Sequence, residues 1–94
     1  MVHNSSCDKF AAGSARIDNR CKAVLDDIAV QMRSNPGATL LVTGYDRVKG
    51  KLATTSAENA KTYLVTTHQI EASRITVVSA SGTEHKVDYE LTIP

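Results

Sequence analysis

The stretch TLLVTGYDRVKGKLATTSAENAKTYL, residues 39–64, decides the fold that the sequence predicts. It opens with an apolar, β-branched run that ends at Gly44, and this run predicts a strand over residues 39–43. Residues 45–51 are mostly polar and predict a loop, whereas residues 52–64 predict a helix. The sequence therefore places a strand–loop–helix unit in the middle of the chain.

The loop of this unit is the best place in the chain for a binding site. Between the end of a strand and the start of a helix, backbone N–H groups gather and the helix dipole presents its positive end. An anionic group can therefore bind there. We expect the functional residues to lie between Tyr45 and Ser56, and the rest of the chain to serve as scaffold.

The composition fits one globular domain and argues against several classes of protein. With 94 residues, of which 41% are hydrophobic and 22% charged, the chain is not typical of a disordered segment. A net charge of +1, with basic residues spread along the chain, argues against a nucleic-acid-binding surface. No apolar run reaches the roughly 18–20 residues that span a bilayer, so we expect that this domain does not itself cross a membrane.

Cys7 and Cys21 are the only cysteines of the chain. Two cysteines are too few for a structural zinc site, and their spacing resembles no zinc motif. A disulfide between them would close a loop of about 15 residues and stabilise the fold by about 3 kcal/mol. On spacing alone, the disulfide and a pair of free thiols are both open.

A further helix is predicted from a stripe of apolar residues spaced three and four apart, from Cys21 to Met32. Asp18 is a good N-cap, and Pro36 with Gly37 prevents the helix from continuing. The elements predicted outside the central stretch are a strand at 7–12, this helix at 18–34, a strand at 75–79 and a strand at 86–93.

The predicted order is β-α-β-α-β-β, which indicates an α+β fold. Two helices packed on one face of a small mixed sheet form the natural two-layer arrangement of these elements. The strand at 39–43 is apolar on both faces, as is typical of a central strand. The last two strands are joined by a short turn and predict a hairpin. Residues 1–6 are polar and predict a flexible segment, so that the domain spans residues 7–94.

The sequence lacks the residue patterns that are typical of active sites. It has no Ser/His/Asp or Cys/His spacing, no convincing pair of carboxylates and no phosphate-binding glycine loop. His3, His68 and His85 are scattered along the chain and predict surface histidines. We therefore expect a protein that is not an enzyme and that uses no cofactor and no metal ion.

The order and spacing of several short motifs resemble the OmpA-like C-terminal domain. This family is the peptidoglycan-binding module of Gram-negative outer-membrane and periplasmic proteins. The resemblance covers residues 10–94. The matching segments are LDDIA at 25–29, NPGATL at 35–40, GYD at 44–46, LATTSAENAKTYL at 52–64 and QIEASRI at 69–75.

The resemblance implies a module in the periplasm or at the periplasmic face of the outer membrane that binds the diaminopimelate part of the peptidoglycan stem peptide without catalysis. In the family, a loop Asp accepts from the ligand's ammonium and a helix Arg pairs with its carboxylate. Asp46 matches the loop Asp, and Ser56 stands at the position of the Arg. The resemblance also favours a disulfide between Cys7 and Cys21. The predicted ligand-binding residues are Gly44, Tyr45, Asp46, Arg47 and Ser56.

The sequence departs from the family at this ligand site. Ser56 is short and neutral, and the loop that follows Gly44 is shorter than is usual in the family. The loss of a bidentate contact to a carboxylate costs about 1.5–3 kcal/mol, although Arg47, next to Asp46, is another source of positive charge. These departures leave open a degenerate member of the fold that no longer binds peptidoglycan and acts as a structural or protein-interaction domain. Free thiols would instead favour an unrelated cytosolic domain.

Overall fold

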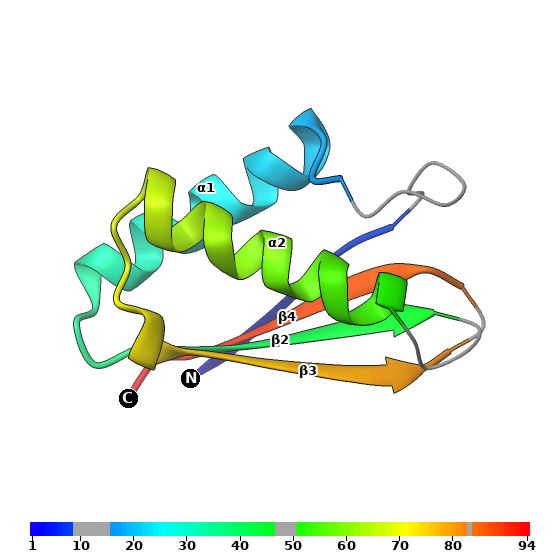
Figure 1. Cartoon of the computed structure of the whole chain (residues 1–94). Helices are drawn as coiled ribbons and strands as arrows, with labels where there is room; N and C mark the ends of the chain where they lie inside the picture. Colours follow the sequence, from blue (N-terminus) through cyan, green and yellow to red (C-terminus); the bar gives the residue numbers. More distant parts are fainter. Residues whose placement is uncertain (9–15, 47–50, 83) are drawn as a thin grey trace.

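The computed structural model describes residues 1–8, 16–46, 51–82 and 84–94 of the chain (Figure 1). Arg47 and most of the strand predicted at residues 7–12 lie outside the described residues. The elements are the strands β1 (Val2–Cys7), β2 (Thr39–Asp46), β3 (Ile75–Ser81) and β4 (Lys86–Thr92), the helices α1 (Asn19–Ser34) and α2 (Lys51–Thr67), and a 3-10 helix at Ala72–Arg74.

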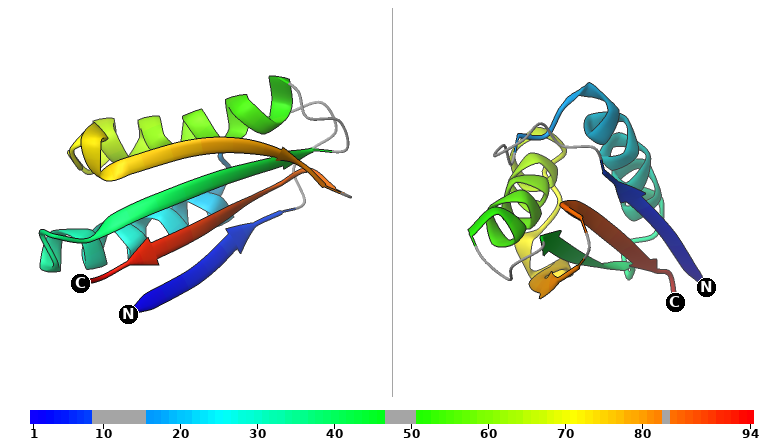
Figure 2. Two further views of the ribbon diagram at one scale, coloured as in Figure 1. Left: turned by 90° about the horizontal axis from the view of Figure 1, so that it is seen from below. Right: turned by 90° about the vertical axis from the view of Figure 1, so that its right-hand side faces the viewer.

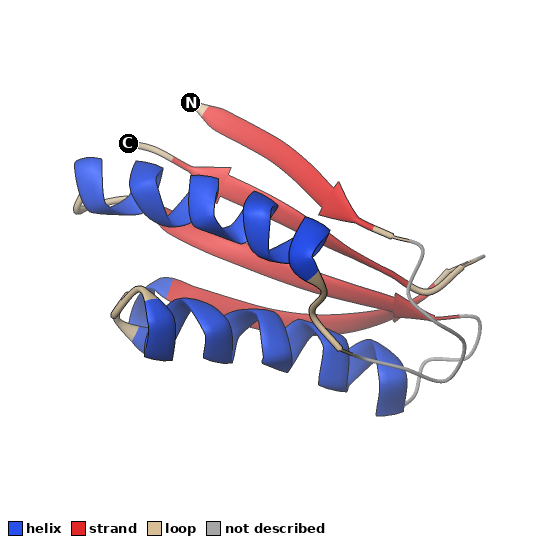
Figure 3. Cartoon of the chain, turned by 90° about the horizontal axis from the view of Figure 1, so that it is seen from above, coloured by secondary structure: helices blue, strands red, loops and turns tan. Residues whose placement is uncertain are grey.

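The molecule has two layers, with both helices on one face of a four-stranded sheet (Figures 2 and 3). The strand order is β1-β4-β2-β3, in which β2 and β3 are parallel and the other neighbours are antiparallel. This arrangement confirms the predicted α+β fold and the central position of β2. Within the described ranges, no helix is long and apolar enough to cross a bilayer.

The predicted hairpin of the last two strands is wrong. β4 pairs with β1 and β2, whereas β3 pairs with β2 at the opposite edge of the sheet. The burial of the two strands gives the physical reason, because β4 has a continuous buried face and β3 buries only Ile75. The strand with more apolar surface to cover takes the interior position. The buried residues of β4 are Val87, Tyr89 and Leu91.

Residues 2–6, which the sequence predicts to be flexible, are instead part of an edge strand. β1 pairs with β4 in an unbroken antiparallel register from Val2–Thr92 to Cys7–Val87. The Met1 ammonium also donates to the Ile93 carbonyl at 2.8 Å. Only Cys7 of this strand is buried, so backbone pairing holds the strand and its side chains give little hydrophobic signal in the sequence.

Cys7 and Cys21 form a disulfide that joins the end of β1 to the first turn of α1. Asp18 caps this helix, and its side chain accepts from the Cys21 backbone N–H at 2.9 Å. The predicted apolar stripe of α1 is confirmed, because the residues that the helix buries are Cys21, Leu25, Ile28, Ala29 and Met32.

The second helix covers β2 with small side chains. Ala53, Ala57, Ala60 and Leu64 are fully buried, and they lie over the sheet. Beneath the helices, Tyr89 is also buried, and its hydroxyl has no hydrogen-bond partner among the described residues. Burial raises the pKa of Tyr89 well above its usual value. Among the described residues, Tyr89 is therefore the one fully buried aromatic residue in a mainly aliphatic core.

A polar cluster joins the two helices at their exposed side. The Tyr63 hydroxyl and the His68 Nε2 each lie 2.6 Å from the same carboxylate oxygen of Asp26, which belongs to α1. The Tyr63 and His68 rings meet edge to face with their centroids 5.5 Å apart. The hydroxyl of Tyr63, followed by His68, holds the pKa of Asp26 below its usual value, while Asp26 raises the pKa of Tyr63.

The disulfide should account for a large part of the stability. We expect the Cys7→Ala/Cys21→Ala variant to lose about 3 kcal/mol of unfolding free energy, since the closed loop has a sequence separation of 14. Urea denaturation measures this loss, and the slope should rise because the uncrosslinked chain exposes more surface on unfolding. The reduced wild-type protein is the matched control. Equal unfolding midpoints for the oxidised protein and the variant would contradict this assignment.

The polar cluster should make stability depend on pH. Because the folded state lowers the pKa of Asp26, its contribution is present above the ordinary carboxyl pKa and is lost as pH falls through the lowered value. In Tyr63→Phe, we expect the pKa of Asp26 to rise towards its usual value, as measured by NMR titration of the carboxyl carbon. Tyr45→Phe, on the far face of the sheet, is the control. An unchanged Asp26 pKa in Tyr63→Phe would refute the role of this hydroxyl.

Candidate functional site

The described residues of the predicted site lie at the end of the sheet where β2 finishes. The last paired residues of β2 and β4 are Tyr45 and Lys86, so continuing the register by one step places Asp46 beside His85. On its other side Asp46 pairs with Ser81 of β3. The side chains of Asp46 and His85 lie on the face of the sheet that the helices cover, like Gly44 and Val87 before them.

Gly44 allows α2 to pack directly on β2. A Cβ atom added at Gly44 would lie 2.0 Å from the Ala53 carbonyl oxygen and 3.2 Å from the Ala57 Cβ. No side chain fits in this space, so glycine is required by the close approach of helix and strand. Gly44 thus has a packing role in the structure, and its predicted contact with a ligand remains a prediction.

Tyr45 and Asp46 lie on opposite faces of the sheet. The Tyr45 ring packs beside Gly82, where an added Cβ would lie 3.2 Å from the ring, and the Lys86 ammonium lies 5.2 Å from the ring centroid. Asp46 is half-buried on the helix-covered face, and its carbonyl oxygen accepts from the Gly82 N–H at 2.8 Å. The structure therefore does not bring the Tyr45 side chain to the Asp46 side chain.

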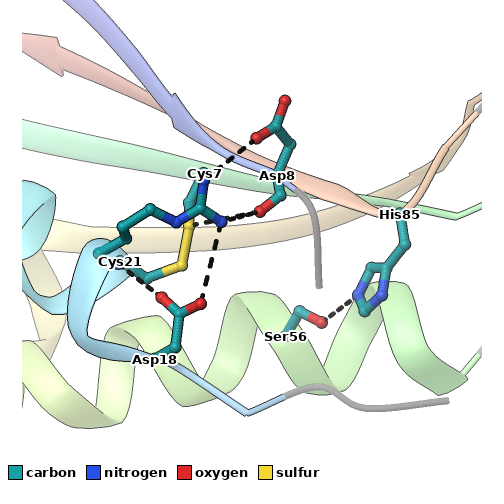
Figure 4. The surroundings of a disulfide bond; sticks show 7 residues. Cys7, Asp8, Asp18, Cys21, Ser56 and His85 are labelled. Atoms are coloured by element: carbon teal, nitrogen blue, oxygen red, sulfur yellow. Dashed lines mark hydrogen bonds and ion pairs between the residues drawn. A yellow bond between two sulfur atoms is a disulfide. The ribbon is translucent and has the colours of Figure 1, made fainter. Parts of the chain in front are cut away.

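Ser56 is fully buried, although it is the residue at the position of the family's arginine. Its hydroxyl donates to the Leu52 carbonyl at 2.7 Å, and the His85 Nε2 lies 2.5 Å from the same oxygen atom (Figure 4). A serine hydroxyl has one proton, and that proton is used by Leu52. We therefore assign the proton of the second contact to His85, so that its Nε2–H donates to Ser56.

His85 is the site residue that the sequence did not reveal. The chain predicts scattered surface histidines, but His85 is half-buried and contacts a residue 29 positions away in the sequence. His68 is also half-buried against Asp26, whereas His3 is exposed. The sequence does contain one indication of this role. His85 directly precedes the alternating strand that begins at Lys86, and the start of this strand lies beside the end of β2 in the sheet.

The contact between Ser56 and His85 differs from a nucleophile activated by a base. In such a pair the serine hydroxyl donates its proton to the imidazole, and the serine oxygen must be reachable by a substrate. Here the hydroxyl donates to Leu52 and the side chain is fully buried. The geometry supports a structural contact that orients the imidazole ring.

The disulfide lies at the same end of the molecule (Figure 4). Beside it, the Arg20 guanidinium donates to the Asp8 carbonyl at 2.7 Å and lies 3.8 Å from the Asp18 carboxylate. Among the described residues, Cys7, Asp18 and Cys21 form the single group of possible metal ligands, with ligand atoms within 4.8 Å of one another. Because both sulfurs are in the disulfide, the oxidised protein offers no thiolate to a metal ion there.

Two shallow hollows lie away from Asp46 and Ser56. One, of about 340 Å³, follows the outer face of the sheet and contains Tyr45, Asp88 and Glu90. The other, of about 550 Å³, lies between the start of α1 and the outer side of α2. Among the described residues of the predicted ligand-binding set, Tyr45 lines the first of these two hollows, and Gly44, Asp46 and Ser56 line neither.

Comparison with known proteins identifies the family. The model of the OmpA family matches residues 9–93, which is nearly the whole chain. The chain belongs to the OmpA family. No curated protein sequence matches this OmpA-family domain.

Solved structures share the fold of this OmpA-family domain at low sequence identity. The OmpA-like domain of FopA1 from Francisella tularensis matches with a TM-score of 0.78 and 13% identity, over 98% of this chain and 73% of that one. The cell wall anchor of the T6SS from Pseudomonas aeruginosa matches with a TM-score of 0.75 and 20% identity, over 99% of this chain and 82% of that one. The peptidoglycan-associated lipoprotein from Burkholderia pseudomallei matches with a TM-score of 0.75 and 17% identity, over 93% of this chain and 89% of that one. These likenesses show the fold alone.

The close packing at Gly44 can be tested in this OmpA-family domain by Gly44→Ala. We expect a loss of about 1–3 kcal/mol of unfolding free energy, because the helix backbone must move away from the new methyl group. Gly37→Ala is the matched control, since its Cβ would meet only the Pro94 ring at 3.3 Å. Thermal or urea unfolding measures both variants. Equal stability of the two variants would show that α2 does not press on β2 at this point.

Proposed function

We propose that this domain is a non-catalytic module that binds peptidoglycan. In this role it attaches an outer-membrane or periplasmic protein of a Gram-negative bacterium to the cell wall. Membership of the OmpA family supports the proposal, as do the matches to a cell wall anchor and to a peptidoglycan-associated lipoprotein. The proposal places the domain in the periplasm or at the periplasmic face of the outer membrane.

The observation that carries the proposal is the position of Asp46. Asp46 is half-buried and is the last residue of the central strand, on the face that α2 covers. A carboxylate in such a place suits a primary ammonium, because a charge-assisted hydrogen bond is about twice as strong as a neutral one. We propose that Asp46 accepts from the ammonium of diaminopimelate in the stem peptide. The other residues of the proposed ligand-binding set are Gly44, Tyr45, Arg47 and Ser56. Arg47 is included only because it follows Asp46 in the sequence.

One observation favours a second function. Ser56 is fully buried and is engaged by Leu52 and His85, so this position of α2 presents no charge to a ligand. A domain that has given up this contact could retain the fold and serve as a structural or protein-interaction domain of the envelope. The two functions differ in whether the isolated domain binds the cell wall.

Pull-down of the purified domain with isolated sacculi separates the two functions. We expect wild-type protein to sediment with the sacculi and Asp46→Ala to remain in the supernatant, because the proposed ammonium contact is lost. Glu90→Ala is the matched control, since it removes one carboxylate from the exposed outer face of the sheet. It should sediment like wild type.

Each outcome of this experiment decides between the two functions. Loss of sedimentation in Asp46→Ala alone supports peptidoglycan binding at this edge. Equal sedimentation of all three proteins would refute the role of Asp46. A wild-type domain that stays in the supernatant would favour the degenerate fold with a protein partner. Circular dichroism of each variant shows whether it is folded.

A further inference from the structure

We propose that Cys7, Cys21 and Asp18 form a binding site for a single Zn²⁺ ion when the disulfide is reduced. In that state the metal ion replaces the disulfide as the link between β1 and α1. The inference does not depend on the proposed function, because it concerns the cross-link of the fold and holds whether or not the domain binds peptidoglycan.

The first step is the set of ligand atoms. Two cysteines alone are too few for a zinc site, and the fold supplies a third ligand. The sulfur atoms of Cys7 and Cys21 and a carboxylate oxygen of Asp18 lie within 4.8 Å of one another. Thiolate sulfur and carboxylate oxygen both bind zinc, and three protein ligands leave the fourth tetrahedral position to a water molecule. The cluster thus has the kinds of ligand that zinc takes.

The second step is the spacing of the two sulfurs. Two sulfurs bound to one tetrahedral zinc ion are about 3.8 Å apart, as follows from the Zn–S bond length. The Cα atoms of Cys7 and Cys21 are 5.6 Å apart, and reduced cysteine side chains can change rotamer to separate their sulfurs by this amount. The ion can therefore enter by rotation of side chains, while β1 and α1 keep their places.

The third step is the position of Asp18, which can bind the ion and remain the N-cap of α1. One of its oxygens accepts from the Cys21 N–H at 2.9 Å. The other lies 3.8 Å from the Arg20 guanidinium, which is beyond hydrogen-bond distance. Figure 4 shows the Asp18 carboxylate beside the sulfurs and the Asp8 carboxylate pointing away from them. Asp18 is therefore the carboxylate that the fold presents to the two cysteines.

The fourth step is the balance of charge. Cys7 and Cys21 are buried, and a buried charge is costly unless an opposite charge compensates it. Two thiolates and the Asp18 carboxylate carry one negative charge more than Zn²⁺ neutralises. The Arg20 guanidinium beside Asp18 compensates this remaining charge. The thiolates therefore form together with metal binding, which releases their protons.

The reduced state requires a two-electron reductant, and a dithiol is the class that supplies it. One thiolate of the dithiol attacks a sulfur of the disulfide and forms a mixed disulfide, which its second thiol then resolves. The dithiol leaves as a disulfide, and the protein gains two electrons and two protons as two thiols. Zn²⁺ displaces these protons without changing its own oxidation state. Metal ion and disulfide therefore exclude each other.

The test uses Co²⁺ as a spectroscopic probe of the zinc position, with protein that has been reduced by a dithiol and desalted without oxygen. Tetrahedral thiolate coordination gives Co²⁺ strong visible absorption. We expect this absorption with reduced wild type and not with the oxidised protein. Competition with Zn²⁺ then gives the affinity of each variant for zinc.

Asp18→Asn is the decisive variant, because asparagine is an equally good N-cap. It should bind Zn²⁺ at least about tenfold more weakly, since even supporting contacts in metal sites have effects of this size. Asp8→Asn is the matched control. It removes a carboxylate that also lies near Arg20, at 3.9 Å, but points away from the sulfurs. Its affinity should stay within about twofold of wild type.

Weaker zinc binding in Asp18→Asn alone supports our inference. Equal affinities of Asp18→Asn and wild type overturn it, as does the same loss in both aspartate variants. Reduced wild type that gives no visible absorption with Co²⁺, whether folded or unfolded, also overturns it. Urea unfolding is the second measurement. Zn²⁺ should raise the midpoint of reduced wild type and not that of Cys7→Ala/Cys21→Ala, and an unchanged midpoint of reduced wild type overturns the inference.

Discussion

The close contact between α2 and β2 at Gly44 sets the rest of the structure. There is no room for a side chain between Gly44 and the Ala53 carbonyl, so the backbone of α2 packs directly against the backbone of β2 at this point. The buried alanines of α2 extend this contact along the strand. Between Ala53 and Ala57, which make this contact, the same helix carries Ser56, which meets His85. The packing constraint and the site geometry therefore have one cause.

Local patterns predicted the elements well, and non-local pairing was the source of the errors. The apolar stripe of α1 and the alternation of β4 both correspond to buried faces in the structure. The predicted hairpin failed because the position of a strand depends on how much apolar surface each strand must bury. β1 was missed because it buries only Cys7, so its stability comes from backbone pairing and the disulfide, which hydrophobic patterning does not record.

The residues of the candidate site stay predictions, and they differ in how visible they are in the sequence. Asp46 was proposed from the sequence because the end of an apolar strand is visible there. His85 was not, since its contact with Ser56 depends on the rotation of α2 and on β4 lying next to β2. The burial of Ser56 likewise depends on the position of α2 and could not be predicted from the sequence. In the structure its hydroxyl contacts His85.

Met1 and Pro94 lie at the end of the sheet opposite to the end that carries Asp46 and His85 (Figure 2). A force applied between Met1 and the candidate site would therefore run along the strands. Antiparallel hydrogen bonds are perpendicular to the strands, so the β1–β4 ladder would be loaded in shear, with its bonds sharing the load at once. At the far end of β1, the Cys7–Cys21 bond would pass the remaining tension to α1. The disulfide thus ties the edge strand β1 to α1 at the end of the sheet where the load would arrive.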